Sequence, residues 1–155
     1  MPILLDDIGT IATTTKRPTL AARRLGYTVS VGINAMLLYA TNVWPGWDAL
    51  PFLTSDTELV IGLVNASIIV NLAANVVYLL RDPPWLRALG DILTLSIGLV
   101  AMAQIWLVFP FDFGGSTFDW TLVARILLGV GIVGSVIGIL AAMVSFVKAL
   151  SARSA

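Results

Sequence analysis

Four long apolar stretches govern what this chain can fold into. A helix that crosses the hydrocarbon core of a bilayer needs about 20 mainly apolar residues. The ranges 25–44, 57–80, 88–109 and 121–147 each have that character, which leaves only short connections, a leader over 1–24 and a tail after 147. The sequence therefore predicts an all-α fold: a polytopic membrane protein with a four-transmembrane-helix bundle and short loops.

The composition supports this prediction and excludes several classes of function. Hydrophobic residues make up 58% of the 155 residues, charged residues 12%, and the mean hydropathy is +0.94. A soluble domain of this size cannot hide so much apolar surface. The chain has no His and no Cys, which excludes the usual haem, zinc and iron–sulfur ligands and removes disulfide or His-based catalysis. Neither a nucleotide-binding motif nor a basic patch for nucleic acid is present. The residues thus predict no cofactor, no metal and no nucleic-acid partner, and they show no catalytic constellation.

The basic residues predict the orientation, because Lys and Arg are retained on the cytoplasmic side of a membrane. Every one except Arg125 precedes the first stretch, separates the second from the third, or follows the fourth. The two remaining loops instead carry acids, which are Asp48, Asp56, Glu58, Asp112 and Asp119. We expect both termini to face the cytoplasm. The seven arginines against two lysines, with frequent Ala, Val and Gly, favour a GC-rich bacterial gene and hence an inner (plasma) membrane.

Local signals predict helix starts. Ser55 and Glu58 have the spacing of a capping box, and Asp82 is a capping acid before prolines that suit a first helical turn. In the leader, Leu4 and Ile8 lie on one face of a possible helix. The leader is therefore interpreted as an amphipathic interfacial helix, with a disordered segment as the alternative.

Aromatic residues gather around the two acidic loops. Rings at the headgroup level are typical of interfacial anchoring, and an aromatic ligand box is the alternative interpretation. The residues are Trp44, Trp47, Phe52, Trp106, Phe109, Phe111, Phe113, Phe118 and Trp120.

Two charged residues fall inside the predicted spans. Arg125 lies about one turn into the fourth, where it needs a partner or must reach outward. We expect a structural ion pair with an acid of the neighbouring loops, and a contact with an anionic ligand is the alternative. Asp91, in the third span, follows Arg87 by four residues and favours a shallow ion pair with it, with proton coupling as the alternative.

Amide side chains are frequent within the spans. An amide that faces lipid is costly, so these residues favour interhelical hydrogen bonds, and a polar ligand pocket is the alternative. They are Asn34, Asn65, Asn71, Asn75 and Gln104.

A stripe of small residues follows one face of the fourth span. Such residues let a neighbouring helix approach closely. The predicted packing residues are Gly131, Gly134, Ser135, Gly138 and Ala142. Their partner is left open: the first span, a second copy or another protein.

Three functions are consistent with these features. The leading hypothesis is a protein that acts by helix contact, as an accessory or assembly subunit of a larger membrane complex or as a homo-oligomer. The second is a small transporter or channel with an Asn- and Gln-lined path, which a faint repeat of the two hairpins also favours. The third is a lipid-binding or lipid-handling protein.

Overall fold

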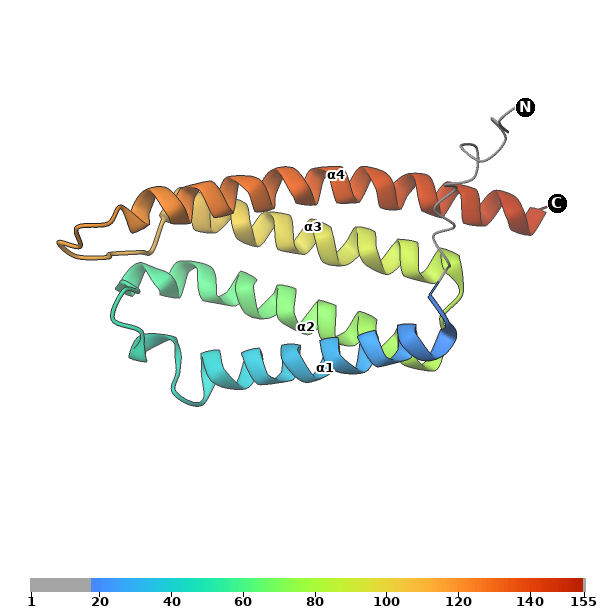
Figure 1. Cartoon of the computed structure of the whole chain (residues 1–155), viewed down its shortest axis with the longest axis horizontal. Helices are drawn as coiled ribbons and strands as arrows, with labels where there is room; N and C mark the ends of the chain where they lie inside the picture. Colours follow the sequence, from blue (N-terminus) through green and yellow to red (C-terminus); the bar gives the residue numbers. More distant parts are fainter. Residues whose placement is uncertain (1–17, 155) are drawn as a thin grey trace, which may run out of the picture.

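The computed structural model of the chain describes residues 18–154, and the leader residues Leu4 and Ile8 lie outside that range. Four long helices are joined by two loops and a tight turn (Figure 1). The elements in chain order are α1 (Leu20–Asn42), η2 (Trp47–Ala49), η3 (Ser55–Thr57), α2 (Glu58–Leu80), α3 (Pro84–Val108) and α4 (Trp120–Ser154). The described part of the chain contains no β-strand, and the all-α prediction is confirmed.

The helices follow one another across the molecule in chain order. The extensive interfaces are those of α1 with α2, α2 with α3, and α3 with α4. Figure 1 places α1 and α4 at opposite edges of this row. Each of the two edge helices therefore has one flank that no other helix of the described chain covers.

The two ends of the bundle differ in their connections. The start of α1, the α2–α3 turn and the end of α4 lie together at one end, called the terminal end below (Figure 1). The loops 43–57 and 109–119 lie together at the other, called the two-loop end. The terminal end carries most of the basic residues, and five acids lie at the two-loop end, so the charge asymmetry of the sequence runs along the bundle axis.

Three of the four helices are long and apolar enough to cross a membrane. The spans are Ser55–Leu80, Pro84–Val108 and Trp120–Ala152. α1 has 23 residues, about 34 Å of helix, but it is the least apolar of the four. Tyr27, Ser30, Asn34 and Thr41 lower its hydropathy.

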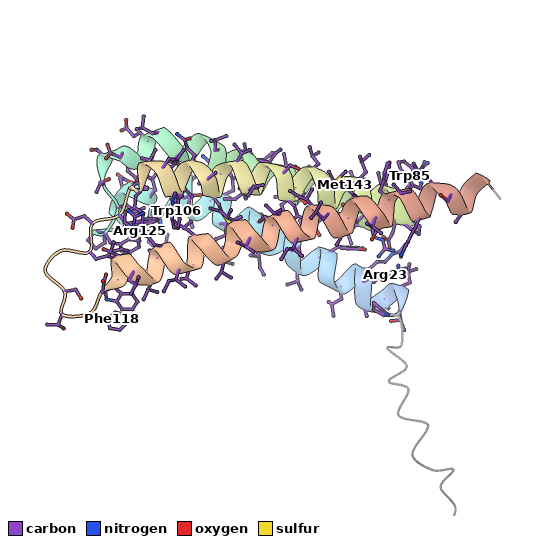
Figure 2. All side chains as sticks on the ribbon, turned by 90° about the horizontal axis from the view of Figure 1, so that it is seen from above. Arg23, Trp85, Trp106, Phe118, Arg125 and Met143 are labelled. Atoms are coloured by element: carbon purple, nitrogen blue, oxygen red, sulfur yellow. The ribbon has the colours of Figure 1, made fainter. Side chains whose placement is uncertain are left out.

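Few side chains are buried inside the molecule. The buried apolar residues lie on α2, α3 and α4 and are Val60, Tyr78, Ala88, Ala101 and Ala142. Most large apolar side chains instead project outward around the bundle (Figure 2). Such a distribution suits helices whose surroundings are lipid, because hydrocarbon chains are as apolar as the side chains that face them.

Two predicted helix starts are wrong. Ser55 opens the short helix η3, and the N-cap of α2 is Thr57, which makes no side-chain capping bond. In α3, Pro83 is the N-cap and Pro84 is the first helical residue. Asp82 does not cap this helix, because its carboxylate is bound by two arginine side chains.

The two loops are joined to each other by backbone hydrogen bonds. Leu53 and Phe111 form an isolated antiparallel bridge. The amide of Asp112 donates to the carbonyl of Phe52 at 2.9 Å, and that of Thr54 donates to the carbonyl of Pro110 at 3.1 Å. Pro110 is fully buried at this junction. The α1–α2 hairpin is thereby tied to the α3–α4 hairpin at the two-loop end.

Candidate functional site

Asp82 is the centre of a polar cluster at the terminal end. Its Oδ2 lies 3.3 Å from Nη2 of Arg23 on α1, and its Oδ1 lies 2.8 Å from Nε of Arg87 on α3. Oδ1 also accepts a hydrogen bond of 3.0 Å from the hydroxyl of Tyr27. The Asp82 side chain is only 10% exposed. One carboxylate in the α2–α3 turn therefore joins the first helix to the third.

Two tyrosines extend this cluster toward α3. The rings of Tyr27 and Tyr78 lie 5.4 Å apart between centroids. The Tyr78 hydroxyl donates to the carbonyl of Arg87 at 3.0 Å and lies 3.5 Å from Oδ1 of Asp91. Gly90 makes this approach possible, because a Cβ there would collide with the Tyr78 hydroxyl. Hydrogen bonds and ion pairs thus run from α1 through the turn to α3.

Asp91 does not form the expected ion pair with Arg87. The Arg87 guanidinium is turned toward Asp82, and Asp91 forms no ion pair with any described residue. Asp91 instead lines a pocket of about 370 Å³ between α3 and α4, and Ser145 of α4 also lines it. Its carboxylate therefore keeps capacity for a further hydrogen bond.

Arg125 is held by aromatic rings, and its predicted pairing with an acid is wrong. Its guanidinium carbon lies 4.3 Å from the ring centroid of Phe109 and 5.5 Å from that of Trp106. Arg125 and Trp106 are labelled in Figure 2. The nearby acids have backbone partners: Asp112 accepts from the amide of Gly114, and Asp119 accepts from the amide of Leu122. The guanidinium thus finds a cation–π contact where an ion pair was expected.

The amides of the first two helices form two connections between them. Asn34 Nδ2 donates to Oδ1 of Asn71 at 3.2 Å, and Asn75 Nδ2 donates to the same oxygen at 2.8 Å. Nearer the two-loop end, Asn42 and Asn65 exchange reciprocal bonds of 2.9 and 2.7 Å. These contacts place four amides between α1 and α2 and leave Asn75 bonded within α2.

Gln104 is not part of either connection. It lies on α3, and its side chain forms no hydrogen bond within residues 18–154. The structure therefore does not bring the five predicted intramembrane amides together on one polar path.

Most of the small-residue stripe faces α3. A Cβ at Gly131 would meet Sδ of Met102, and one at Gly138 would meet Cδ1 of Leu95 at 3.0 Å. Ser135 and Ala142 are buried. Gly134 lies apart, because a Cβ there meets nothing within 4 Å. This stripe packs one helix of the chain against its neighbour.

Sequence reasoning missed the Asp82 cluster, and it named the aromatic residues without predicting how their rings stack. Phe113 stacks on Phe52 at 6.0 Å and on Phe111 at 5.9 Å, with the ring of Phe109 next to Phe111. The alternation of Phe at 109, 111 and 113 was a signal for extended backbone. Arg87, five residues after Asp82, was a signal for an ion pair, whereas Arg23 lies far from Asp82 in the sequence and gave none.

The described residues contain no group of three His, Cys, Asp or Glu side chains able to hold a metal ion. Their chemistry is ion pairing, hydrogen bonding and cation–π contact within helical walls. No family model, curated protein or solved structure matches the chain. Its function therefore has to be inferred from its own geometry.

Proposed function

We propose that this chain is a four-span inner-membrane protein that acts by helix contact, as an accessory subunit of a membrane complex or as a homo-oligomer. The observation that supports it best is the packing order of the helices. α1 and α4 share no extensive interface, so each leaves one flank without a protein neighbour. A further subunit can cover such a flank without disturbing the contacts inside the chain.

α1 is the proposed fourth span. It is as long as α2, at 23 residues, and its Asn34, Thr41 and Asn42 side chains are bonded to α2 or to its own backbone. Satisfied amides cost less in hydrocarbon than free ones, so a helix below the usual hydropathy can still cross a bilayer beside α2. Basic residues at the terminal end favour the cytoplasm for that end.

Two features limit the alternatives. The Asn34–Asn71 and Asn42–Asn65 bonds account for four amides as interhelical connections, which weakens the case for an amide-lined transport path. The small-residue stripe is occupied by α3, so an external partner has to meet another surface. On α4 the exposed apolar residues Val133, Ile137 and Val144 form such a surface.

Native mass spectrometry of the full chain in a mild nonionic detergent tests the proposal. We expect either a multiple of the chain mass or a stoichiometric complex with another membrane protein. Ile137→Trp, on the free flank of α4, and Met36→Trp, on the exposed surface of α1, should show which flank the partner covers, because only the substitution on the covered flank should reduce that assembly. A monomer without any bound protein, in detergent and in lipid nanodiscs, would contradict the proposal.

A further inference from the structure

A groove at the two-loop end lies between the two loops. It has a volume of about 630 Å³, within the range of small-molecule sites, and Phe52, Asp112, Phe113 and Trp120 line it. Phe52 comes from the first loop and Phe113 from the second, so the groove exists only because the loops are held together. The backbone bond from Asp112 to the carbonyl of Phe52 makes that connection at the groove itself.

The chemistry of this lining selects a cation. The faces of aromatic rings are electronegative, and three of the lining residues are aromatic. Phe113 stacks on Phe52 and on Phe111, so Trp120 and Phe52 are the lining rings that keep a face for a ligand. The only ionisable group in the lining is the Asp112 carboxylate. Within the described residues this carboxylate forms no ion pair. Its Oδ1 accepts one backbone hydrogen bond, from Gly114 at 2.9 Å, which fixes its direction.

The charged residues around the groove also favour a positively charged ligand. The two-loop end carries Asp48, Asp56, Glu58 and Asp119 besides Asp112. Arg125, the base at this end, has its guanidinium over Phe109 and Trp106. The field at the groove therefore attracts positive ligands and repels anions.

We infer that this groove binds a small organic cation of the quaternary ammonium class. Such a cation is weakly hydrated, so it enters an aromatic groove at a lower desolvation cost than a primary ammonium ion. Its methyl groups pack on the rings while its charge lies near the Asp112 carboxylate. A free cation fits this acidic end better than a zwitterionic phosphocholine headgroup, whose phosphate would meet the acids.

The probe is choline, titrated into the full chain in a nonionic detergent and followed by tryptophan fluorescence and calorimetry. We expect saturable binding. Neohexanol, the uncharged carbon isostere of choline, should bind at least about threefold more weakly, because it lacks the cation–π and carboxylate contributions. Glycerophosphocholine should also bind more weakly than choline. If neohexanol binds as tightly as choline, the groove is only an apolar surface. If glycerophosphocholine binds as tightly as choline, the groove binds lipid headgroups. Either result would overturn the proposal.

Asp112→Asn and Asp56→Asn form a matched pair of variants. Each removes one negative charge from the same end, but only Asp112 lines the groove. An asparagine at 112 retains an oxygen that can accept the Gly114 hydrogen bond, so the loop should keep its fold. We expect Asp112→Asn to weaken choline binding about three- to tenfold and Asp56→Asn to leave it nearly unchanged. Equal losses of choline affinity in both variants would mean that the overall negative charge of this end attracts choline and that the groove is not a binding site. If Asp112→Asn lowers the melting temperature, Trp120→Leu replaces it, with the same expected loss.

Discussion

The guanidinium carbon of Arg125 lies 4.3 Å from the centre of the Phe109 ring, so an aromatic face holds the base at the two-loop end. Phe109 ends α3 with a φ of 46°, a left-handed conformation that is uncommon for a bulky residue. The chain reverses there and the ring lies between α4 and Phe111. The same turn places Pro110 and Phe111 where they bond the first loop.

A double-mutant cycle on Arg125 and Phe109 should detect this contact. Arg125→Leu and Phe109→Leu are expected to destabilise the chain, with a coupling of about 1 kcal/mol between them. Unfolding of the purified protein in sodium dodecyl sulfate measures the free energies. The cycle of Arg125→Leu with Asp56→Asn is the control and should show no coupling. A larger coupling with an acid than with Phe109 would contradict the aromatic assignment.

Asp82 should be the most important acid for stability. Asp82→Asn leaves the guanidinium groups of Arg23 and Arg87 close together without a carboxylate between them, at an expected loss of about 2 kcal/mol. The matched control is Asp91→Asn, whose carboxylate forms no ion pair within the described residues. Unfolding in detergent compares the two.

A second substitution separates charge from packing at Asp82. Arg23→Met removes one of the two cations that share the carboxylate. In the Asp82→Asn background it should therefore be much less harmful than in the wild-type chain. Strictly additive losses would mean that Arg23 and Asp82 do not interact.

The sequence allowed the helices to be predicted because the length of an apolar stretch is a local property. Asp82 and Arg125 were less predictable because their partners depend on the loops. One oxygen of Asp112 and one of Asp119 accept hydrogen bonds from the amides of Gly114 and Leu122, and the turn geometry decides that. Asp82 has the sequence position of a capping acid, but its rotamer is decided by Arg23 on another helix.

The candidate groove was visible in the sequence only as a concentration of aromatic residues. Interfacial anchoring explains such a concentration equally well. The distinguishing fact is the bridge between Leu53 and Phe111, a pairing of residues from separate loops that local patterns do not encode. Similarly, the direction of the small-residue stripe depended on which neighbour, α3 or an outside helix, lies beside α4.

Asn71 should be the amide whose loss costs most. Its Oδ1 accepts from both Asn34 and Asn75. Asn71→Leu is expected to destabilise the chain by about 1–2 kcal/mol, and Asn75→Leu by less, because the Asn75 side chain donates only to Asn71 on its own helix within the described residues. Unfolding in detergent measures both losses. If Asn71→Leu is neutral while Asn75→Leu is harmful, the connection between α1 and α2 is not the one described.

The glycines of α4 provide a matched series for the α3–α4 interface. Gly138→Leu should lower stability by about 1–3 kcal/mol, because its Cβ alone would already lie 3.0 Å from Leu95. Gly134→Leu, four residues earlier on the same helix, should be neutral or slightly stabilising, since its Cβ meets nothing within 4 Å and Leu is the better helix former. Thermal unfolding in detergent measures both. Equal losses at the two positions would mean that an outside partner, or a different α3–α4 register, covers Gly134.

The orientation of the chain can be tested with single cysteines, because the sequence contains none of its own. Ser116 lies in the loop 109–119 at the two-loop end, and Ser151 lies near the end of α4 at the terminal end. If the basic terminal end faces the cytoplasm, a membrane-impermeant maleimide added to intact cells should label Ser116→Cys and not Ser151→Cys. Inside-out vesicles should give the reverse pattern. Ser116 and Ser151 lie on either side of α4, so their labelling gives the orientation of α4 and does not report on α1. Adding Arg24→Cys extends the test to α1: this position should follow the labelling of Ser151→Cys. Labelling of Arg24→Cys together with Ser116→Cys from outside, with Ser151→Cys protected, would instead leave three spans and place α1 outside the bilayer.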